Sequence, residues 1–184
     1  MGLSQFTQWC ECKISSIAPA RALYSFLYKK AVMEEIELAE VSESDNVLFI
    51  GGGAVPYTSI YIAEKCNKIT VIDCNKCCVS KAQSLLKKLK VGNIEVKNVD
   101  GQDYDFSPYN VIFVPLQAEP KKEILKSIAL TADREAKILI RAPKASCKCY
   151  TPIENIPAKL EKFKKLKQIT FDKTFLCRAK DIKA

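Results

Sequence analysis

The 184-residue sequence contains no histidine. It therefore lacks the side chain that most often acts as a general base near neutral pH and most often ligates metals. Chemistry here must depend on carboxylates, tyrosines, thiols or an already activated cofactor. No apolar run reaches the roughly 18 residues that a membrane helix needs. The N-terminus also lacks the basic and apolar segments of a signal peptide. These absences predict a cytoplasmic protein with no membrane partner.

The nine cysteines are an odd number. Without an export signal, they favour reduced thiols over a disulfide framework. Cys74, Cys77 and Cys78 would bind a metal only if their loop met Cys147 and Cys149. However, Cys77 and Cys78 fall in an expected helix, and a C-x-C pair is a poor chelate. Small buried apolar side chains are the favoured interpretation, so the sequence predicts no metal site.

Positive charge is concentrated near the C-terminus. Residues 1–120 carry 12 basic and 14 acidic side chains, a net charge of −2, whereas residues 121–184 carry 17 and 7, a net charge of +10. Such an excess fits either an anionic partner or a solvated lysine-rich face. The lysines at 162, 164, 165 and 167 have few aromatic residues among them, so base stacking is not indicated. A solvated face is favoured, and nucleic acid is the less favoured alternative.

Short apolar runs alternate with amphipathic stretches along the chain. We expect strands at 47–50, 68–72, 94–99, 111–114, 137–140, 167–171 and 174–177, and helices at 17–41, 56–65, 75–90, 121–130 and 152–165. Strands separated by helices predict a parallel sheet with right-handed crossovers. The two final strands predict an antiparallel edge. The expected fold is a single α/β domain over 1–184, with a helical segment at 1–45 and a sheet-containing core at 46–184.

Three strand ends carry residues suited to a nucleoside. Gly51-Gly52-Gly53 follows the first strand, and glycines permit close approach of a ligand to the backbone. Asp73 ends the second strand, where a carboxylate accepts hydrogen bonds from both hydroxyls of a ribose. Asp100-Gly101 ends the third, where a polar side chain meets an adenine edge. Ligands of open parallel sheets bind at such carboxyl ends. The expected site therefore contains Gly51, Gly52, Gly53, Asp73, Cys74, Asp100, Gly101, Pro115 and Leu116.

The glycine loop distinguishes among nucleoside ligands. Gly51 and Gly53 match the start of the dinucleotide pattern G-x-G-x-x-G, but Pro56 stands at its last position. No phosphate-binding P-loop sequence is present. A hydrophobic strand that ends in G-x-G is similar to the first motif of class I methyltransferases, from which Phe49 and Val55 depart. We expect S-adenosylmethionine as the cofactor.

A narrower resemblance accounts for these departures. The stretch 49–59 resembles the glycine loop of nicotianamine synthases, in which Phe49, the two outer glycines, Pro56 and Thr58 have counterparts. The segment 117–121, Q-A-E-P-K, is similar to the L-A-E-P-K segment of archaeal members. The resemblance implies a Rossmann-like three-layer sandwich with a mainly parallel seven-stranded sheet and an antiparallel C-terminal edge.

The resemblance implies a cofactor but leaves the reaction open. Nicotianamine synthases transfer the 3-amino-3-carboxypropyl group of S-adenosylmethionine to an amine and carry an N-terminal helical domain. Residues 1–45 precede the first strand here, so we expect that domain to be missing. We expect a methyltransferase acting on a small-molecule acceptor. Aminocarboxypropyl transfer is the alternative, and a non-catalytic cofactor-binding subunit is the third. A second copy of the chain, as a homodimer, is left open as a partner.

Tyr57 and Glu119 are the candidates for orienting or deprotonating an acceptor. Tyr57 follows the glycine loop, and Glu119 follows the fourth strand. Each has a structural alternative, because Tyr57 can be a packing residue and Glu119 can cap the helix that follows it. Tyr24 and Tyr28 lie on the N-terminal helix, where ordinary packing is the favoured interpretation.

Overall fold

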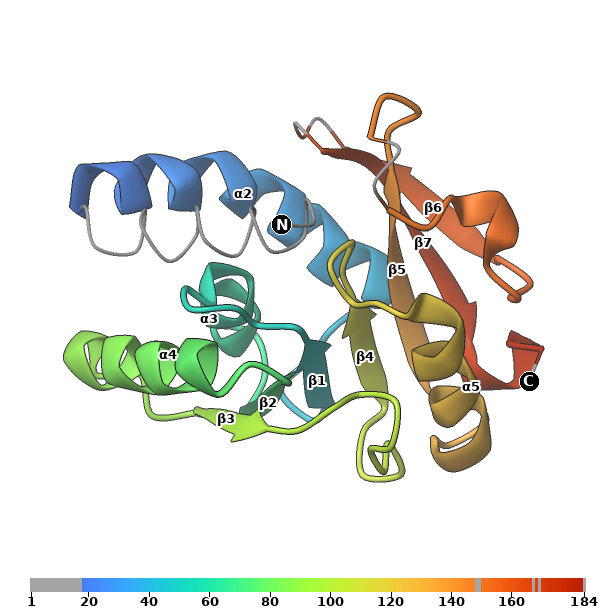
Figure 1. Ribbon diagram of the computed structural model, residues 1–184, viewed down its shortest axis with the longest axis horizontal. Helices are drawn as coiled ribbons and strands as arrows, with labels where there is room; N and C mark the ends of the chain where they lie inside the picture. The colour runs from blue at the N-terminus through green and yellow to red at the C-terminus, as the bar shows by residue number, and fades with distance from the viewer. Residues whose placement is uncertain (1–17, 148–149, 167, 169, 184) are drawn as a thin grey trace.

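A seven-stranded sheet in the order β3-β2-β1-β4-β5-β7-β6 forms the centre of the protein (Figure 1). The structure is a computed structural model that describes residues 18–147, 150–166, 168 and 170–183. The strands are β1 (Asn46–Ile50), β2 (Lys68–Asp73), β3 (Ile94–Asn98), β4 (Val111–Val114), β5 (Lys137–Pro143), β6 (Lys162–Lys165) and β7 (Phe171–Arg178). The pairs among β1 to β5 are parallel, and β7 runs antiparallel to both β5 and β6. This is the sheet of a class I methyltransferase fold, so the predicted fold class is confirmed.

Helices cover both faces of the sheet (Figure 1). They are α2 (Ala18–Ala39), α3 (Tyr57–Ala63), α4 (Lys76–Leu89) and α5 (Lys121–Thr131), with short 3-10 turns η1 (Ile153–Asn155) and η2 (Ala179–Asp181). Apolar residues of α2, α3 and α4 share one cluster, and those of α5 belong to a second. None of the described helices is long and apolar enough to cross a membrane.

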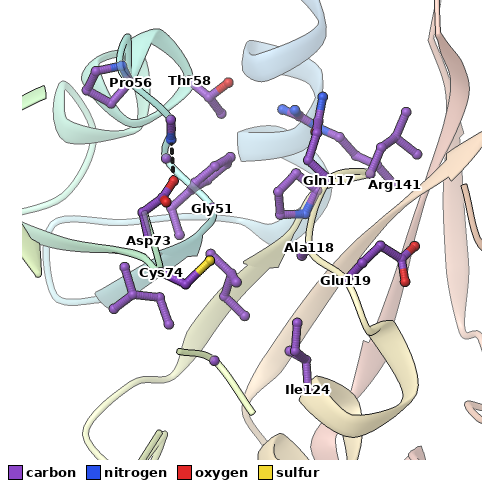
Figure 2. Close-up of a pocket in the computed structure, with 18 of the residues that line it drawn as sticks. Gly51, Pro56, Thr58, Asp73, Cys74, Gln117, Ala118, Glu119, Ile124 and Arg141 are labelled. Atoms are coloured by element: carbon purple, nitrogen blue, oxygen red, sulfur yellow. Dashed lines mark hydrogen bonds between the residues drawn. The ribbon is translucent and has the colours of Figure 1, made fainter. Parts of the chain in front are cut away.

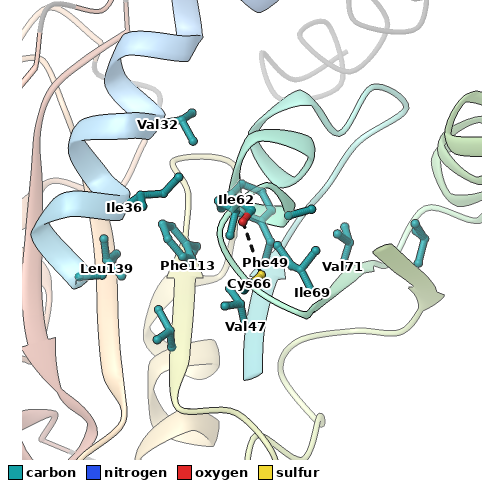
Figure 3. Packing of buried hydrophobic residues seen from close by; sticks show 14 of the residues in the cluster. Val32, Ile36, Val47, Phe49, Ile62, Cys66, Ile69, Val71, Phe113 and Leu139 are labelled. Atoms are coloured by element: carbon teal, nitrogen blue, oxygen red, sulfur yellow. Dashed lines mark hydrogen bonds between the residues drawn. The ribbon is translucent and has the colours of Figure 1, made fainter. Parts of the chain in front are cut away.

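Strand β1 shows why the sheet is buried on both faces. Val47 and Phe49 belong to the cluster with α2 and α3, whereas Leu48 and Ile50 belong to the cluster with α5. Side chains alternate between the two faces along a strand, so a wholly apolar run serves two layers at once. Figure 3 shows Val32 and Ile36 of α2 beside Phe113 and Leu139 of the sheet. The sandwich thus fixes the strand ends that carry the predicted site.

The helix predicted at 152–165 is wrong. The segment forms η1, a single bridge from Ala158 to Ile182, and then strand β6. Pro157 has no backbone N–H to donate and disfavours a helix across it. Phe163 lies opposite Phe175 of β7, with ring centroids 5.6 Å apart. Pairing with β7 therefore prevails over the helical preference of the lysines.

The two strands predicted at 167–171 and 174–177 are also wrong in detail. Phe171–Arg178 is one continuous strand, and Asp172 and Lys173 lie within it instead of forming a turn. Its neighbours are β5 on one side and β6 on the other. The number of strands and the antiparallel edge are as predicted, but the edge strand comes from 162–165. Lys167 and Ile169 lie outside the described residues.

Candidate functional site

A cleft opens at the carboxyl ends of β1, β2 and β4. It has about 1140 Å³ of empty space, which includes solvent at its mouth. Its lining contains every residue predicted to bind the cofactor, together with both predicted catalytic residues: Gly51, Gly52, Gly53, Tyr57, Asp73, Cys74, Asp100, Gly101, Pro115, Leu116 and Glu119. Figure 2 shows Asp73 and Cys74 on one side of the cleft and Gln117, Ala118 and Glu119 on the other. The roles of these residues remain predictions, but the fold does bring them together.

The glycine loop needs glycine for two separate reasons. Gly51 and Gly53 have φ angles of +69° and +62°, in the left-handed region that side chains disfavour. Gly52 lies against β2, where an added Cβ would stand 2.2 Å from Cγ1 of Val71. The Gly51 amide donates to the Ile72 carbonyl at 2.7 Å, which fixes the loop to the end of β2. The loop therefore presents bare backbone to the cleft.

Asp73 joins the glycine loop to the turn after β2. Its Oδ2 accepts a hydrogen bond from the Gly53 amide at 2.8 Å, and its Oδ1 accepts one from the Asn75 amide at 2.8 Å. The side chain of Asn98 donates to the Asp73 carbonyl at 2.9 Å. A carboxylate offers about four lone-pair sites. These bonds therefore hold the side chain in place and still leave acceptors for ligand hydroxyls.

Cys74 and Asp100 stand at the rim beside Asp73. Burial, with the charges of Asp73 and Asp100, raises the pKa of the Cys74 thiol. Asp100 accepts hydrogen bonds from the backbone and side chain of Gln102. Because a raised pKa keeps a thiol protonated and less nucleophilic, Cys74 suits a contact surface better than covalent chemistry.

The opposite side of the cleft contains a buried ion pair. Arg141 of β5 donates from Nε and Nη2 to the two carboxylate oxygens of Glu35 on α2, at 2.8 and 2.7 Å. Thr174 of β7 donates its hydroxyl to the same carboxylate at 2.6 Å. Glu35 is fully buried and Arg141 is 6% exposed. The network ties α2 to β5 and β7 and cancels the charge of the arginine that lines the cleft.

Aromatic rings surround this arginine. The guanidinium lies 4.8 Å from the ring centroid of Phe171 and 5.9 Å from that of Phe49. The ring of Tyr28 is 6.2 Å from that of Phe171. Tyr28, Phe49 and Phe171 all line the cleft. Such packing holds Arg141 by cation–π contact as well as by its ion pair.

The loop from 115 to 119 forms the wall of the cleft that faces Asp73 (Figure 2). Glu119 Oε2 accepts hydrogen bonds from the Lys121 amide and the Thr151 hydroxyl, both at 2.9 Å, and Oε1 accepts one from the Thr151 amide at 3.2 Å. The structural alternative for Glu119, a tie to the start of α5, is therefore present. Its catalytic role stays a prediction.

Comparison with known protein families adds to this geometry. Residues 17–126 match the family model of protein-L-isoaspartate(D-aspartate) O-methyltransferase. The chain belongs to this family. Its members are S-adenosylmethionine-dependent methyltransferases, and they use S-adenosylmethionine as cofactor. The matched residues include the glycine loop, Asp73 and the 115–119 wall. No curated protein matches the chain.

Solved structures with the same fold include MtNAS. A point mutant of MtNAS superposes with a TM-score of 0.79 at 17% identity, covering 95% of this chain and 70% of that one. MtNAS bound to S-adenosylmethionine gives 0.73 at 19% identity, covering 95% and 72%. An RNA methyltransferase from Salinibacter ruber, bound to S-adenosyl-L-homocysteine, gives 0.65 at 16% identity, covering 82% and 90%. These likenesses agree with the resemblance to nicotianamine synthases and show a shared fold.

Sequence reasoning missed several lining residues. Arg141 directly follows the strand predicted at 137–140, as Asp73 follows the one predicted at 68–72, so this position was an available signal, although β5 extends to Pro143 in the structure. Thr170 and Phe171 gave no signal, because the strand boundary there was misplaced. Tyr28 was interpreted as a packing residue; it does pack against Phe171, and it also lines the cleft. The side chain of Tyr24 lies outside the described residues.

The cysteines form no cluster in the part of the chain that the structure describes. Within it, no group of three or more histidine, cysteine, aspartate or glutamate side chains is arranged to hold a metal ion. Cys66, Cys78 and Cys177 are buried. Burial raises the pKa of Cys66 to about 11 and that of Cys177 to about 12, helped by nearby carboxylates. Cys149 lies outside the described residues.

Proposed function

We propose that this chain binds S-adenosylmethionine in the cleft and transfers its methyl group to a small molecule. One observation carries the proposal: the glycine loop, Asp73, Asp100 and the 115–119 wall line one continuous cleft. Each feature alone is common at strand ends. Their union in a member of a methyltransferase family supports a nucleoside cofactor lying across the sheet.

The residues of the cleft suit the cofactor. Ile50, Ile72 and Ile124 supply apolar lining, as an adenine ring requires. We expect Asp73 to accept hydrogen bonds from the ribose hydroxyls. The charged lining residues are Asp73, Asp100, Glu119 and Arg141, and Arg141 is paired with Glu35. The lining is thus acidic although the whole chain carries a net charge of +8. This sign favours a cationic sulfonium.

The cofactor would supply the electrophile, a carbon bonded to the sulfonium. The protein then has to orient an acceptor in line and exclude water. A site without histidine can do this, because no strong base is needed for an acceptor that is already nucleophilic. Tyr57 and Glu119 remain our candidates for contacting the acceptor. Glu119 is held by three hydrogen bonds and so would act from a fixed position.

The acceptor is proposed from the cleft itself. The family match ends at residue 126, whereas Arg141, Thr170 and Phe171 lie beyond it and line the far side. The family's name specifies a carboxylate of a protein as the methyl acceptor. The family match therefore supports the cofactor site of this chain but not that acceptor. Aromatic rings and a neutralised arginine inside a cleft support a small acceptor in contact with Phe171 and Tyr28.

Aminocarboxypropyl transfer is the second candidate. It is supported by the glycine-loop resemblance to nicotianamine synthases and by the likeness to MtNAS over 95% of the chain. The two reactions leave different nucleosides. Methyl transfer leaves S-adenosylhomocysteine, and aminocarboxypropyl transfer leaves methylthioadenosine. Chromatography after incubation with candidate acceptors separates them. Cofactor binding with neither product would favour the third alternative, a subunit that completes its site with a partner.

Calorimetry tests the binding claim directly. We expect S-adenosylmethionine to bind the unaltered chain and Asp73→Ala to weaken binding by roughly 1–3 kcal/mol, the range for stranded hydrogen-bond partners. Asp103→Ala is the matched control, because Asp103 is exposed and does not line the cleft. Circular dichroism should show that both variants are folded. No detectable heat at millimolar cofactor would refute the proposal.

A further inference from the structure

The wall of the cleft at 115–119 has few backbone hydrogen bonds within itself. It connects the end of β4 to the start of α5, and all five of its residues line the cleft. It forms no regular secondary structure. Within it, the Ala118 amide donates a hydrogen bond to the Pro115 carbonyl at 3.3 Å. Buried carbonyls without partners cost free energy. The carbonyls of this wall therefore need another donor.

Lys121 supplies that donor from inside the protein. Its side chain is 1% exposed. Its Nζ donates to the carbonyls of Pro115 at 3.0 Å, Ala118 at 3.1 Å and Leu116 at 3.3 Å. An ammonium has three donors, so the three carbonyls match them. Three carbonyls of the wall are thereby directed to one buried point.

This placement of a lysine is electrostatically unfavourable. Lys121 is the first residue of α5, where the helix dipole is positive and disfavours a cation. Burial lowers the pKa of Lys121 to about 8, although Glu119, with its Oε1 3.9 Å from Nζ, acts in the opposite direction. Packing of α5 does not need the charge, because Ile124, Leu125 and Ile128 already supply its buried face. A residue that breaks the usual preferences for charge burial and for helix N-termini in this way is expected at functional positions.

We propose that Lys121 is a positioning residue for the ligand of the cleft: its ammonium fixes the wall at 115–119 by holding three of its carbonyls. The inference rests on the proposed function, since the wall faces the expected cofactor. Lys121 would not touch the ligand. It would act through Leu116 and Ala118, whose backbone it anchors and which line the cleft.

Lys121→Met tests this with little change of volume. Lys122→Met is the matched control, because Lys122 is the next residue and is exposed. The probes are S-adenosylmethionine and methylthioadenosine, and the measurement is calorimetry at pH 7. We expect Lys121→Met to weaken both probes about tenfold, as stranded carbonyls would. Lys122→Met should stay within about twofold. Lys121→Gln, which keeps an amide donor, should recover part of the loss.

The pH profile separates positioning from a merely structural role. Glu119 is the charged group that faces the ammonium among the described residues. Methylthioadenosine has no amino-acid group that titrates near neutral pH. We expect its affinity for the unaltered chain to fall about threefold between pH 7 and 9.5, as the ammonium loses one donor. Lys121→Met should show no such fall. Because Cys74 is present in both proteins, its titration cancels in the comparison.

Hydrogen exchange supplies a readout without ligand. Peptides spanning 115–119 should exchange faster in Lys121→Met than in Lys122→Met. Equal affinity and equal exchange in the two variants would overturn the positioning role. Failure of the unaltered chain to bind either probe would instead refute the proposed function, and the exchange comparison would still decide the role of Lys121. If Lys121→Met does not fold, the pH profile of the unaltered chain and Lys121→Gln decide, and a flat profile overturns the proposal.

Discussion

The two sides of the cleft are held in different ways. On the side that we propose for the cofactor, every one of these contacts involves a backbone amide: the glycine loop bonds to the end of β2, and the Asp73 carboxylate accepts from the amides of Gly53 and Asn75. On the side that we propose for the acceptor, buried charged side chains join distant segments. Glu35 and Arg141 are 106 residues apart in the sequence, and Glu35 and Thr174 are 139 apart.

The difference indicates where each side can vary. Backbone contacts depend on glycines and strand ends, which are local features that a family shares. The family match covers the cofactor side and also Glu35, but it ends at residue 126, before Arg141 and Thr174. Charged networks depend on particular pairs, and a new pair can change the shape of a pocket without changing the fold. We infer that specificity for the acceptor resides on the charged side.

The largest effect is expected from Glu35→Gln. Removing this charge leaves the buried Arg141 guanidinium without its counterion, which typically costs about 3–5 kcal/mol. The measurement is the free energy of unfolding in urea. Glu37→Gln is the matched control on the same helix, because the Glu37–Lys164 pair lies at the surface, where the Glu37 side chain is 72% exposed. We expect little change there.

A double variant sharpens this comparison. Replacing both partners, as Glu35→Leu with Arg141→Met, removes the stranded charge and keeps the volume apolar beside Phe49 and Phe171. Such replacements are often close to neutral. The double variant should therefore be more stable than Glu35→Gln alone. Equal or lower stability would show that the network is needed for packing and not only for charge balance.

Sequence reasoning succeeded on the cofactor side, because each of its features is visible in a short stretch of sequence. The apolar run of β1, the glycines after it and Asp73 at the end of β2 are each visible within a few residues. The strand order then brings them together, because parallel strands present their carboxyl ends at one edge. The fold class and the position of the glycine loop were therefore predictable without any knowledge of distant contacts.

The charged side was not predictable, because its contacts join residues that are far apart in the sequence. Nothing near Glu35 in its helix indicates a partner on β5, and nothing at Lys121 indicates three carbonyls behind it. The edge strand β6 was mistaken for a helix because its lysines satisfy either pattern, and only pairing with β7 decides. Residues whose partners lie far along the chain need the fold before their roles can be inferred.

On the backbone side, Gly52→Ala is expected to have an intermediate effect. The added Cβ would stand 2.2 Å from Cγ1 of Val71, a branched side chain in a buried strand, so the loop or β2 must shift. Overpacking of this kind costs about 1–3 kcal/mol and should also weaken S-adenosylmethionine. Gly92→Ala is the control, because no atom lies within 4 Å of its Cβ position. Unfolding and calorimetry of both variants measure the effect, and equal behaviour would contradict a backbone-held loop.

The smallest effect is a pH dependence that the buried charge of Lys121 imposes on stability. The pKa is about 8 in the folded protein and near its ordinary 10.5 in the unfolded chain. Between these values the unfolded chain binds more protons, so this group makes stability rise with pH. From pH 7.5 to 9 the unaltered chain should gain on the order of 1 kcal/mol of stability relative to Lys121→Met.

The raised pKa values of Cys66 and Cys177 change stability in the opposite direction, because those thiols keep their protons longer when folded. They are common to both proteins and cancel in the difference. A difference that stays constant with pH would mean that Lys121 titrates normally and remains an ammonium throughout this range, which would contradict the lowered pKa of the buried side chain.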